Sequence, residues 1–336
     1  MGIDQGKKDY VFASSRVRSV EKYLLSRDKA EAMTNSKTPE DALKILCDLG
    51  YSDGSEAFCL GQFETLLARE IKKAYSFICG IAPDKSELYT FLYPYDYHNL
   101  KVLMKAEFLE TDPQPFLVDA GTIPAAQMAV LIRDRSFVWL TDRMSNALLE
   151  VCDVFARTGD PQIIDLIFDK ACYAEMKNAA AASGSKFIID YVELQIDITN
   201  LKSFVRIRQM GKPWDFFARV FIDGGRIQDK LFIGGYDEPY EQFAEKLIPY
   251  GLSAPMFEGG AMLRETGRFT ALERLCENRI MEFAKGAKYV SFGIEPLAAY
   301  LIAKEVEVRT VRIIITGLLQ GLPKEEISER VRDTYV

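Results

Sequence analysis

The amino-acid sequence predicts an all-α protein made of three similar helical domains. Apolar residues recur at helical spacing along most of the chain, whereas alternating strand patterns are nearly absent. The best strand candidate is the short segment at residues 219–227. A short motif also recurs three times, at intervals of about a hundred residues. With 336 residues the chain exceeds what one hydrophobic core usually serves, which favours several domains.

Three segments define helices especially well. Thr38 precedes Pro39 at the head of one helical pattern, and Asp160 precedes Pro161 at the head of another. A small polar residue followed by proline is typical of an N-cap and the first helical position. Near the C-terminus the apolar spacing runs through residues 294–319, which predicts one helix on the order of 35 Å long.

The recurring motif reads DYHNLK at residues 96–101, DITNLK at 197–202 and EVRTVR at 307–312. Apolar residues follow each copy in the same register, on one face of a helix. The third copy departs from the others at Thr310, which stands in place of Asn. We expect the shared polar positions to hold each domain together rather than to bind partners. They are Asp96, Asn99, Lys101, Asp197, Asn200, Lys202, Glu307 and Arg312.

The sequence around the motif repeats as well. DAGTI follows the first copy at 119–123 and DGGRI follows the second at 223–227, so this segment is interpreted as the link between units. Helical patterns at 63–73 and 272–282 precede the first and third copies, and residues 147–157 are assigned this role in the middle unit. The repeats predict domains at 1–118, 119–222 and 223–336. A pseudo-threefold arrangement would suit three such domains.

The composition argues against several classes of function. A formal net charge of −7 is unlike the basic balance of a general nucleic-acid binder. No apolar run reaches the roughly 20 residues of a membrane-spanning helix, and the N-terminus lacks the apolar stretch of a signal peptide. We therefore expect a cytosolic chain that does not enter the membrane. The six cysteines include no C-x-x-C pair and sit in apolar patterns, so we expect buried, reduced thiols.

The sequence offers no motif for catalysis, cofactor binding or metal binding. His98 is the only histidine and is expected to be a half-exposed helix residue. The pair Gly224–Gly225 belongs to the repeat and is interpreted as a structural joint rather than a phosphate cradle. A carboxylate pair in a cleft is an open alternative. Three C-terminal carboxylates resemble instead the solvated face of a helix: Glu325, Glu326 and Glu329.

An aromatic cluster, YTFLYPYDY at residues 89–97, leads into the first motif copy. Two interpretations are open. These side chains pack in the core at a domain corner, or they form a partner surface, since exposed Tyr and Phe supply large contact areas.

With these residues in view, the chain resembles the C subunit of the V-type/A-type rotary ATPases, the counterpart of the d subunit in eukaryotic V-ATPases. The segment "YDYHNLK" fits the family, and so does the RVR stretch near the N-terminus with Arg16 and Arg18. Thr310 departs from the usual Asn. The C-terminal stretch is the most specific match, through Phe292, Gly293, Lys304, Glu305, Arg309 and Val311.

The resemblance implies a funnel of three similar helical domains with a pseudo-threefold arrangement. It also implies a peripheral position at the cytoplasmic face of the membrane, on the ring of proteolipid subunits. The D and F subunits of the central stalk would enter the funnel's socket. A protein in that place transmits torque for ATP-driven ion transport or ATP synthesis and performs no chemistry. The coupling ion and the direction of operation depend on other subunits.

We hypothesise that arginines and aromatics near domain corners line the contact surfaces: Tyr89, Tyr93, Tyr95, Tyr97, Arg206 and Arg208. Two alternatives differ in class. One is a helical adaptor of another assembly, and the other is an all-α enzyme that uses carboxylates in a cleft.

Overall fold

A computed structural model describes residues 9–51 and 63–336. Throughout these ranges the protein is helical, and no described residue lies in a β-strand. The prediction of an all-α fold is confirmed. Residues 219–227 form the end of a short helix and a loop.

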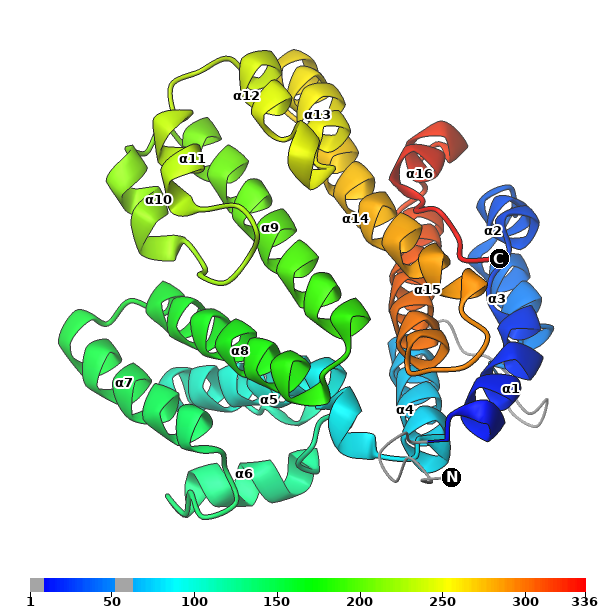
Figure 1. Ribbon diagram of the computed structural model, residues 1–336, viewed down its shortest axis with the longest axis horizontal. Coiled ribbons are helices and arrows are strands. Elements are labelled where there is room, and N and C mark those ends of the chain that lie inside the picture. The colour runs from blue at the N-terminus through cyan, green and yellow to red at the C-terminus, as the bar shows by residue number, and fades with distance from the viewer. Residues whose placement is uncertain (1–8, 52–62) are drawn as a thin grey trace, which may run out of the picture. The chain divides into compact units, whose positions relative to one another are not determined.

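The chain divides into two compact units. Unit 1 combines Met1–Asp84 with Leu231–Val336, and unit 2 is the continuous segment Lys85–Lys230. Unit 1 is therefore built from both ends of the chain. Its described helices are α1 (Val11–Val20), α2 (Arg27–Thr34), α3 (Pro39–Cys47), α4 (Phe63–Ile81), α12 (Tyr240–Lys246), α13 (Ser253–Thr266), α14 (Thr270–Lys285), α15 (Glu295–Leu319) and α16 (Lys324–Arg330), and α11 (Asp229–Gly234) begins at the boundary (Figure 1).

Helix α15 is the centre of unit 1. Its residues are buried along most of its length, and it contacts α1, α2, α3, α4, α14 and α16 (Figure 1). Its 25 residues span about 37 Å, in agreement with the single long helix predicted for residues 294–319.

Unit 2 contains α5 (Tyr89–Leu109), α6 (Ala125–Arg133), α7 (Asp142–Thr158), α8 (Gln162–Ser183), α9 (Lys186–Gln209) and α10 (Trp214–Val220). Helices α5 and α8 pack extensively against each other, and α8 also packs on α7 and α9 (Figure 1). Aromatic side chains fill the α5 interfaces. Tyr97 meets Phe168 edge-on, and Phe108 stacks on Phe155 with ring centroids 4.0 Å apart.

The first predicted helix start agrees with the structure, and the second lies one residue later than predicted. The Thr38 hydroxyl accepts a hydrogen bond from the Asp41 N–H and caps α3, with Pro39 as its first residue. At the second predicted helix start, the Asp160 carboxylate accepts a hydrogen bond from the Gln162 N–H. Helix α8 begins at Gln162, one residue after Pro161.

The cysteine prediction was wrong in part. Cys172 and Cys276 are buried, whereas Cys47 is exposed and Cys79 and Cys152 are half-buried. Cys47 lies beside the buried face of α3 rather than on it, because a helix turns about 100° between neighbouring residues. Cys59 lies outside the described residues.

Among the described helices, none is both long and apolar enough to cross a membrane.

Candidate functional site

The first motif copy binds the connector that follows it. Asp96 on α5 is fully buried. One carboxylate oxygen accepts from the N–H and hydroxyl of Thr122, at 2.9 and 2.7 Å, and the other accepts from the Ile123 N–H at 3.1 Å. Burial raises the pKa of Asp96 to about 6, although these donors lower it. The carboxylate thus satisfies backbone groups at the start of α6.

The second copy repeats this arrangement on α9. The Asp197 carboxylate accepts from the N–H groups of Arg226 and Ile227, at 3.2 and 3.0 Å. Burial again raises the pKa of the carboxyl to about 6. Ile227 stands two residues before α11, as Ile123 stands two residues before α6. The two connectors are therefore held at equivalent positions.

In the first two motif copies, the Asn at the fourth motif position both donates and accepts. Asn99 donates to the Val118 carbonyl at 2.8 Å and accepts from the Val118 N–H at 2.9 Å. Asn200 makes the same two bonds to Ile222, at 2.8 and 2.9 Å. The amide side chain thereby replaces a backbone partner for a loop residue, half-buried Val118 in one copy and buried Ile222 in the other.

The glycine of the connector is explained by sterics. A Cβ at Gly121 would lie 2.1 Å from an Asp96 carboxylate oxygen, and one at Gly225 would lie 2.2 Å from the matching oxygen of Asp197. The connector backbone approaches each carboxylate too closely for any side chain. Gly225, and Gly121 at the equivalent position, are thus part of the joint between motif helix and connector.

The basic residue at the end of the motif forms an ion pair with a neighbouring helix in the first and third copies. Lys101 pairs with Asp169 on α8, and Arg312 pairs with Glu64 on α4 at 2.9 Å. Lys202 is half-buried on α9. Helix α8 is therefore paired with motif helix α5 in the same way as α4 is paired with motif helix α15. The assignment of residues 147–157 as the middle counterpart was wrong: those residues belong to α7, and the paired helix is the next one along the chain.

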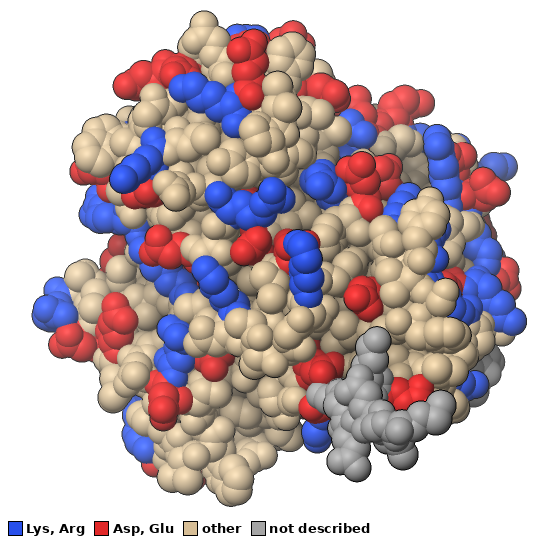
Figure 2. All heavy atoms as spheres, viewed as in Figure 1, with Lys and Arg blue, Asp and Glu red and all other residues tan. Residues whose placement is uncertain are grey.

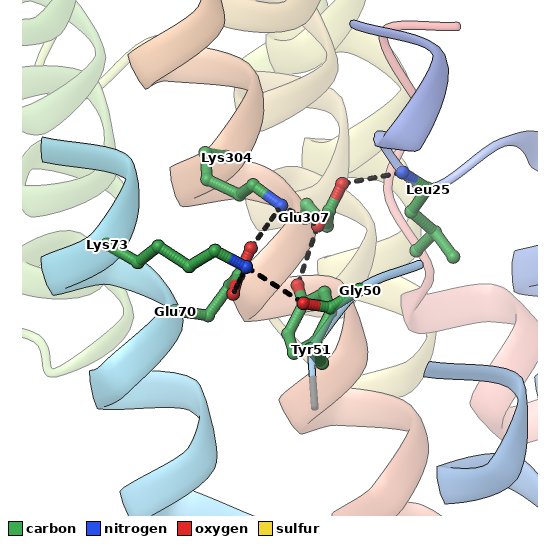
Figure 3. A network of polar contacts seen from close by, with 7 residues as sticks. All are labelled: Leu25, Gly50, Tyr51, Glu70, Lys73, Lys304 and Glu307. Atoms are coloured by element: carbon green, nitrogen blue, oxygen red, sulfur yellow. Dashed lines mark hydrogen bonds and ion pairs between the residues drawn. The ribbon is translucent and has the colours of Figure 1, made fainter. Parts of the chain in front are cut away.

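In the third copy, the N-terminal segment takes the place of a connector. Glu307 on α15 occupies the position of Asp96 and accepts from the Leu25 N–H at 2.6 Å (Figure 3). Leu25 stands two residues before α2, the same register that the other connectors have before α6 and α11. The other Glu307 oxygen accepts from the Tyr51 hydroxyl at 2.6 Å.

A buried lysine balances this third joint. The ammonium of Lys304 lies 2.7 Å from Glu307 and 3.0 Å from Glu70 on α4, and its side chain is 2% exposed (Figure 3). Lys73 approaches Glu70 from the surface at 3.6 Å. Burial alone lowers the pKa of Lys304, but Glu307 and Glu70 raise it to a net value above its ordinary range. Lys304 is therefore charged at neutral pH. We refer to Lys304, Glu307, Glu70 and Tyr51 as the buried ion cluster.

The C-terminal tail completes the same joint from its other side. Thr310 is buried and lines a small cavity together with residues 333–335 of the tail and with Leu24 and Leu25. Arg332 is anchored by Glu277 on α14 at 3.1 Å, and the Asp333 N–H donates to Asn278 at 2.9 Å. The two ends of the chain thus meet at the third motif copy, where the other copies bind one continuous connector.

The predicted interface residues differ in how deeply they are buried. Tyr97 lies in the core and donates to Glu175 at 3.0 Å, whereas Tyr89, Tyr93 and Tyr95 are half-buried. Core packing therefore applies to Tyr97, whereas the partner surface at Tyr89, Tyr93 and Tyr95 stays a prediction. On α9, the Arg206 side chain is exposed, and the half-buried Arg208 lies 5.2 Å from the Phe204 ring centroid.

The polar groups of these joints are engaged with one another rather than arranged around an open site. His98 is exposed on α5, and its Nε2 lies 2.9 Å from the Phe116 carbonyl. Across residues 9–51 and 63–336, no three His, Cys, Asp or Glu side chains converge as a metal site.

The sequence reasoning missed the buried ion cluster. Its signal was present in α15, where Lys304 and Glu307 are three residues apart within a largely apolar helix. A pair of opposite charges at that spacing inside an apolar pattern indicates a buried pair. Glu70 was not identifiable in this way, since it lies 234 residues away in the sequence.

The profile of one protein family, described as ATP synthase (C/AC39) subunit, matches residues 13–330 of the chain. The chain belongs to this family. The match spans the three motif copies, both connectors and helices α2 to α16, so the motif helices and connectors of the joints lie within the matched region.

Named relatives extend the similarity to nearly full length. The C subunit of the V-type sodium ATPase of Enterococcus hirae is 25% identical over 323 residues, which cover 95% of this chain and 97% of the relative. The C subunit of the A-type ATP synthase of Methanocaldococcus jannaschii is 23% identical, over 95% of this chain and 85% of the relative. That of Halobacterium salinarum is 22% identical, over 96% and 97%. The chain is thus a component of a V/A-type rotary ATPase.

Proposed function

We propose that this protein is a non-catalytic rotor component that connects the central stalk of a V/A-type rotary ATPase to its membrane ring. In this proposal it lies peripherally at the cytoplasmic face. The D and F stalk subunits bind on one side and the proteolipid ring on the other. The chain transmits torque for ATP-driven ion transport or ATP synthesis. The observation that carries the proposal is the helix–connector joint, made three times in a chain of this family.

The chemistry of the joints suits a mechanical role. A part that passes on torque must resist deformation, and buried polar groups that are fully hydrogen-bonded fix one geometry. Asp96, Asp197 and Glu307 each accept a hydrogen bond from the backbone N–H of a residue two positions before a helix. These carboxylates are committed to backbone donors, which leaves them unsuited to act as general acids or bases on a substrate.

The three domains at 1–118, 119–222 and 223–336 belong to the same proposal, as does their pseudo-threefold arrangement in a funnel. Support comes from the equivalent joints, each of which links the motif helix of one domain to a connector that belongs to another. A spacer between a ring and a shaft benefits from approximate axial symmetry, because every domain then carries a similar load.

The surface agrees with binding to proteins rather than to nucleic acid. On the face shown in Figure 2, basic and acidic side chains lie intermixed, with no continuous basic stripe. Arg206, Arg208 and the half-buried tyrosines Tyr89, Tyr93 and Tyr95 are proposed contacts with the neighbouring subunits. The burial of Tyr97 suits it to support this cluster from the core.

The experiment that tests the proposed function is purification of the tagged protein from its native host after gentle solubilisation of the membranes. We expect the nucleotide-binding subunits, the D and F subunits and the proteolipid to be recovered with it. Recovery with an unrelated assembly would favour the helical adaptor instead. Turnover of a substrate by the isolated chain would favour the enzyme.

The arginine contacts have their own test. The variants Arg206→Glu and Arg208→Glu should assemble less tightly, because a reversed charge in an interface leaves its partner unpaired. If both variants assemble as well as the wild type, the two arginines are not contacts.

A further inference from the structure

The chain after motif helix α15 repeats the chain after motif helix α9. Glu307 stands 110 residues after Asp197, and at this spacing, without a gap, the seven residues of α16 correspond to the seven of α10. The glycines that follow the two motif helices, Gly211 and Gly321, correspond as well and have the same φ of +65°. The segment after α16 therefore corresponds to the second connector, which follows α10.

The third motif copy lacks the side chain that holds this segment in the second. Asn200 binds the N–H and the carbonyl of Ile222, and the residues at these two positions in the third copy are Thr310 and Arg332. Threonine is shorter than asparagine and carries a single hydroxyl in place of the amide. A cavity of about 10 Å³, close to the space that one water molecule needs, lies beside it. The amide clamp of the second connector is thus replaced by a threonine and a cavity.

A second difference directs the segment after α16 away from its motif helix. Tyr335 stands at the position that corresponds to Gly225. A Cβ at Gly225 would lie 2.2 Å from a carboxylate oxygen of Asp197, so a tyrosine cannot follow the path of the second connector. The segment after α16 therefore leaves the carboxylate of Glu307 to another part of the chain.

The N-terminal segment fills the vacated position. The Leu25 N–H donates to Glu307 in the register that the other connectors have. Leu24 and Leu25 line the small cavity together with residues 333–335, so the two segments adjoin there. The third connector thus consists of two separate pieces. The segment after α16 corresponds to its first part, and the segment before α2 supplies its last part.

The first piece is fastened to α14. The Arg332 side chain donates to Glu277 at 3.1 Å, and both residues are 8% exposed. The Asp333 N–H donates to the side chain of Asn278 at 2.9 Å. We call residues 332–335 the latch.

The other end of the latch reaches the N-terminal segment. Tyr335 is 2% exposed, and the ammonium of Lys288 lies 4.8 Å from its ring centroid. Burial raises the pKa of Tyr335 to about 12, with Glu21 adding to the rise and Arg18 opposing it. Both of these residues shortly precede Leu24 in the sequence. The latch therefore extends from α14 to the segment that carries the Leu25 N–H.

We propose that the latch holds the N-terminal connector on α15, and that displacing it opens the third joint while the first and second joints stay closed. In those two joints the N–H donors Ile123 and Ile227 follow their carboxylates by 27 and 30 residues. A short tether keeps a detached connector close to its carboxylate, which favours rebinding. Glu307 and Leu25 are 282 residues apart, so the third joint depends on non-covalent contacts such as those of the latch.

Amide hydrogen exchange of the isolated full-length protein, resolved to single residues, tests the latch. Tyr335→Ala removes its buried end and should speed exchange of the Leu24 and Leu25 amides by at least about tenfold. The amides of Ile123 and Ile227 report on the first two joints and should stay within about twofold of their wild-type rates.

The matched control is Tyr289→Ala. This tyrosine lies in the same unit, outside the latch, and is 92% exposed. Its truncation removes the same atoms and should leave exchange at the two leucines within about twofold of wild type. Tyr335→Phe keeps the buried ring and should also exchange like the wild type.

A milder variant serves if circular dichroism shows that Tyr335→Ala does not fold. Asn278→Ala removes the acceptor of the Asp333 N–H and should speed exchange at Leu24 and Leu25 about fivefold, the equivalent of one hydrogen bond.

Unchanged exchange at Leu24 and Leu25 in the folded latch variants would overturn the inference. Equal acceleration in Tyr289→Ala would do the same. Acceleration spread evenly over α4, α14 and α15 would make Tyr335 an ordinary core residue of unit 1, which also overturns it. Faster exchange at the first two joints would show that opening is not confined to the third.

Discussion

Replacing Lys304 by Met should be among the most destabilising single substitutions in unit 1. The change removes the ammonium that lies between Glu70 and Glu307 while keeping the volume and length of the side chain similar. Both carboxylates are nearly inaccessible to solvent, with side chains 8% and 3% exposed. Two buried negative charges would then face each other without the cation that pairs them.

The magnitude follows from the burial of the cluster. Breaking a buried ion pair by removing one partner costs about 3–5 kcal/mol, because the remaining charge is desolvated and uncompensated. Glu307 keeps the Tyr51 and Leu25 donors, and Lys73 stays near Glu70, so about 3 kcal/mol is the value we expect. The matched control is Lys73→Met. Its side chain is 64% exposed and 3.6 Å from Glu70, so its loss should cost less than about 1 kcal/mol.

Urea unfolding followed by circular dichroism at pH 7 measures these free energies, with the thermal midpoint as a second reading. The double variant Lys304→Met/Glu70→Gln should recover part of the loss, since it removes one of the two unpaired carboxylates. A Lys304→Met variant as stable as Lys73→Met would refute the idea that the cluster is a buried, charged network. So would a double variant less stable than the single one.

Three further predictions concern the second joint. Asn200→Ala leaves the buried N–H and carbonyl of Ile222 without their partner and should cost about 2–4 kcal/mol in urea unfolding; a cost below about 0.5 kcal/mol would contradict the pairing. Gly225→Ala forces a Cβ into the Asp197 carboxylate and should lower stability, with faster hydrogen exchange at the Arg226 and Ile227 amides as the specific sign. Asp197 binds its proton more tightly in the folded state, with a pKa of about 6, than in the unfolded state, at about 3.9. Stability should therefore fall as pH rises through that window, and the wild type should gain about 1 kcal/mol relative to Asp197→Asn between pH 7 and pH 5. An equal pH dependence in both proteins would exclude this effect.

Local pattern was enough to predict the class of the fold and the position of the first two connectors. Helical periodicity and the Thr38 cap depend on residues close together in the sequence, so the long helix at residues 294–319 could be recognised directly. The motif residues could be recognised because a joint that is formed several times by similar residues produces a repeated sequence motif.

What could not be predicted depends on pairings between distant segments. Nothing near Leu25 in the sequence indicates that its N–H meets Glu307, because this connector shares no D-[AG]-G-x-I letters with the others. Glu70 reads as an ordinary helix carboxylate until α4 and α15 are placed together. The exposure of a tyrosine likewise depends on what packs over it, so the cluster at residues 89–97 could not be divided into core and surface from its composition.

The order in which the ribosome synthesises the chain determines when each unit can be completed. Unit 2 is continuous and is complete once residue 230 has emerged, whereas unit 1 needs both ends of the polypeptide. Glu307 follows Leu25 by 282 residues, a delay of about 14–56 s at a translation rate of roughly 5–20 residues per second. During that interval the N-terminal helices have no α15 to cover their apolar faces. A ribosome that stops before α15 is made would leave the first part of the protein, and not merely its tail, without a folded structure.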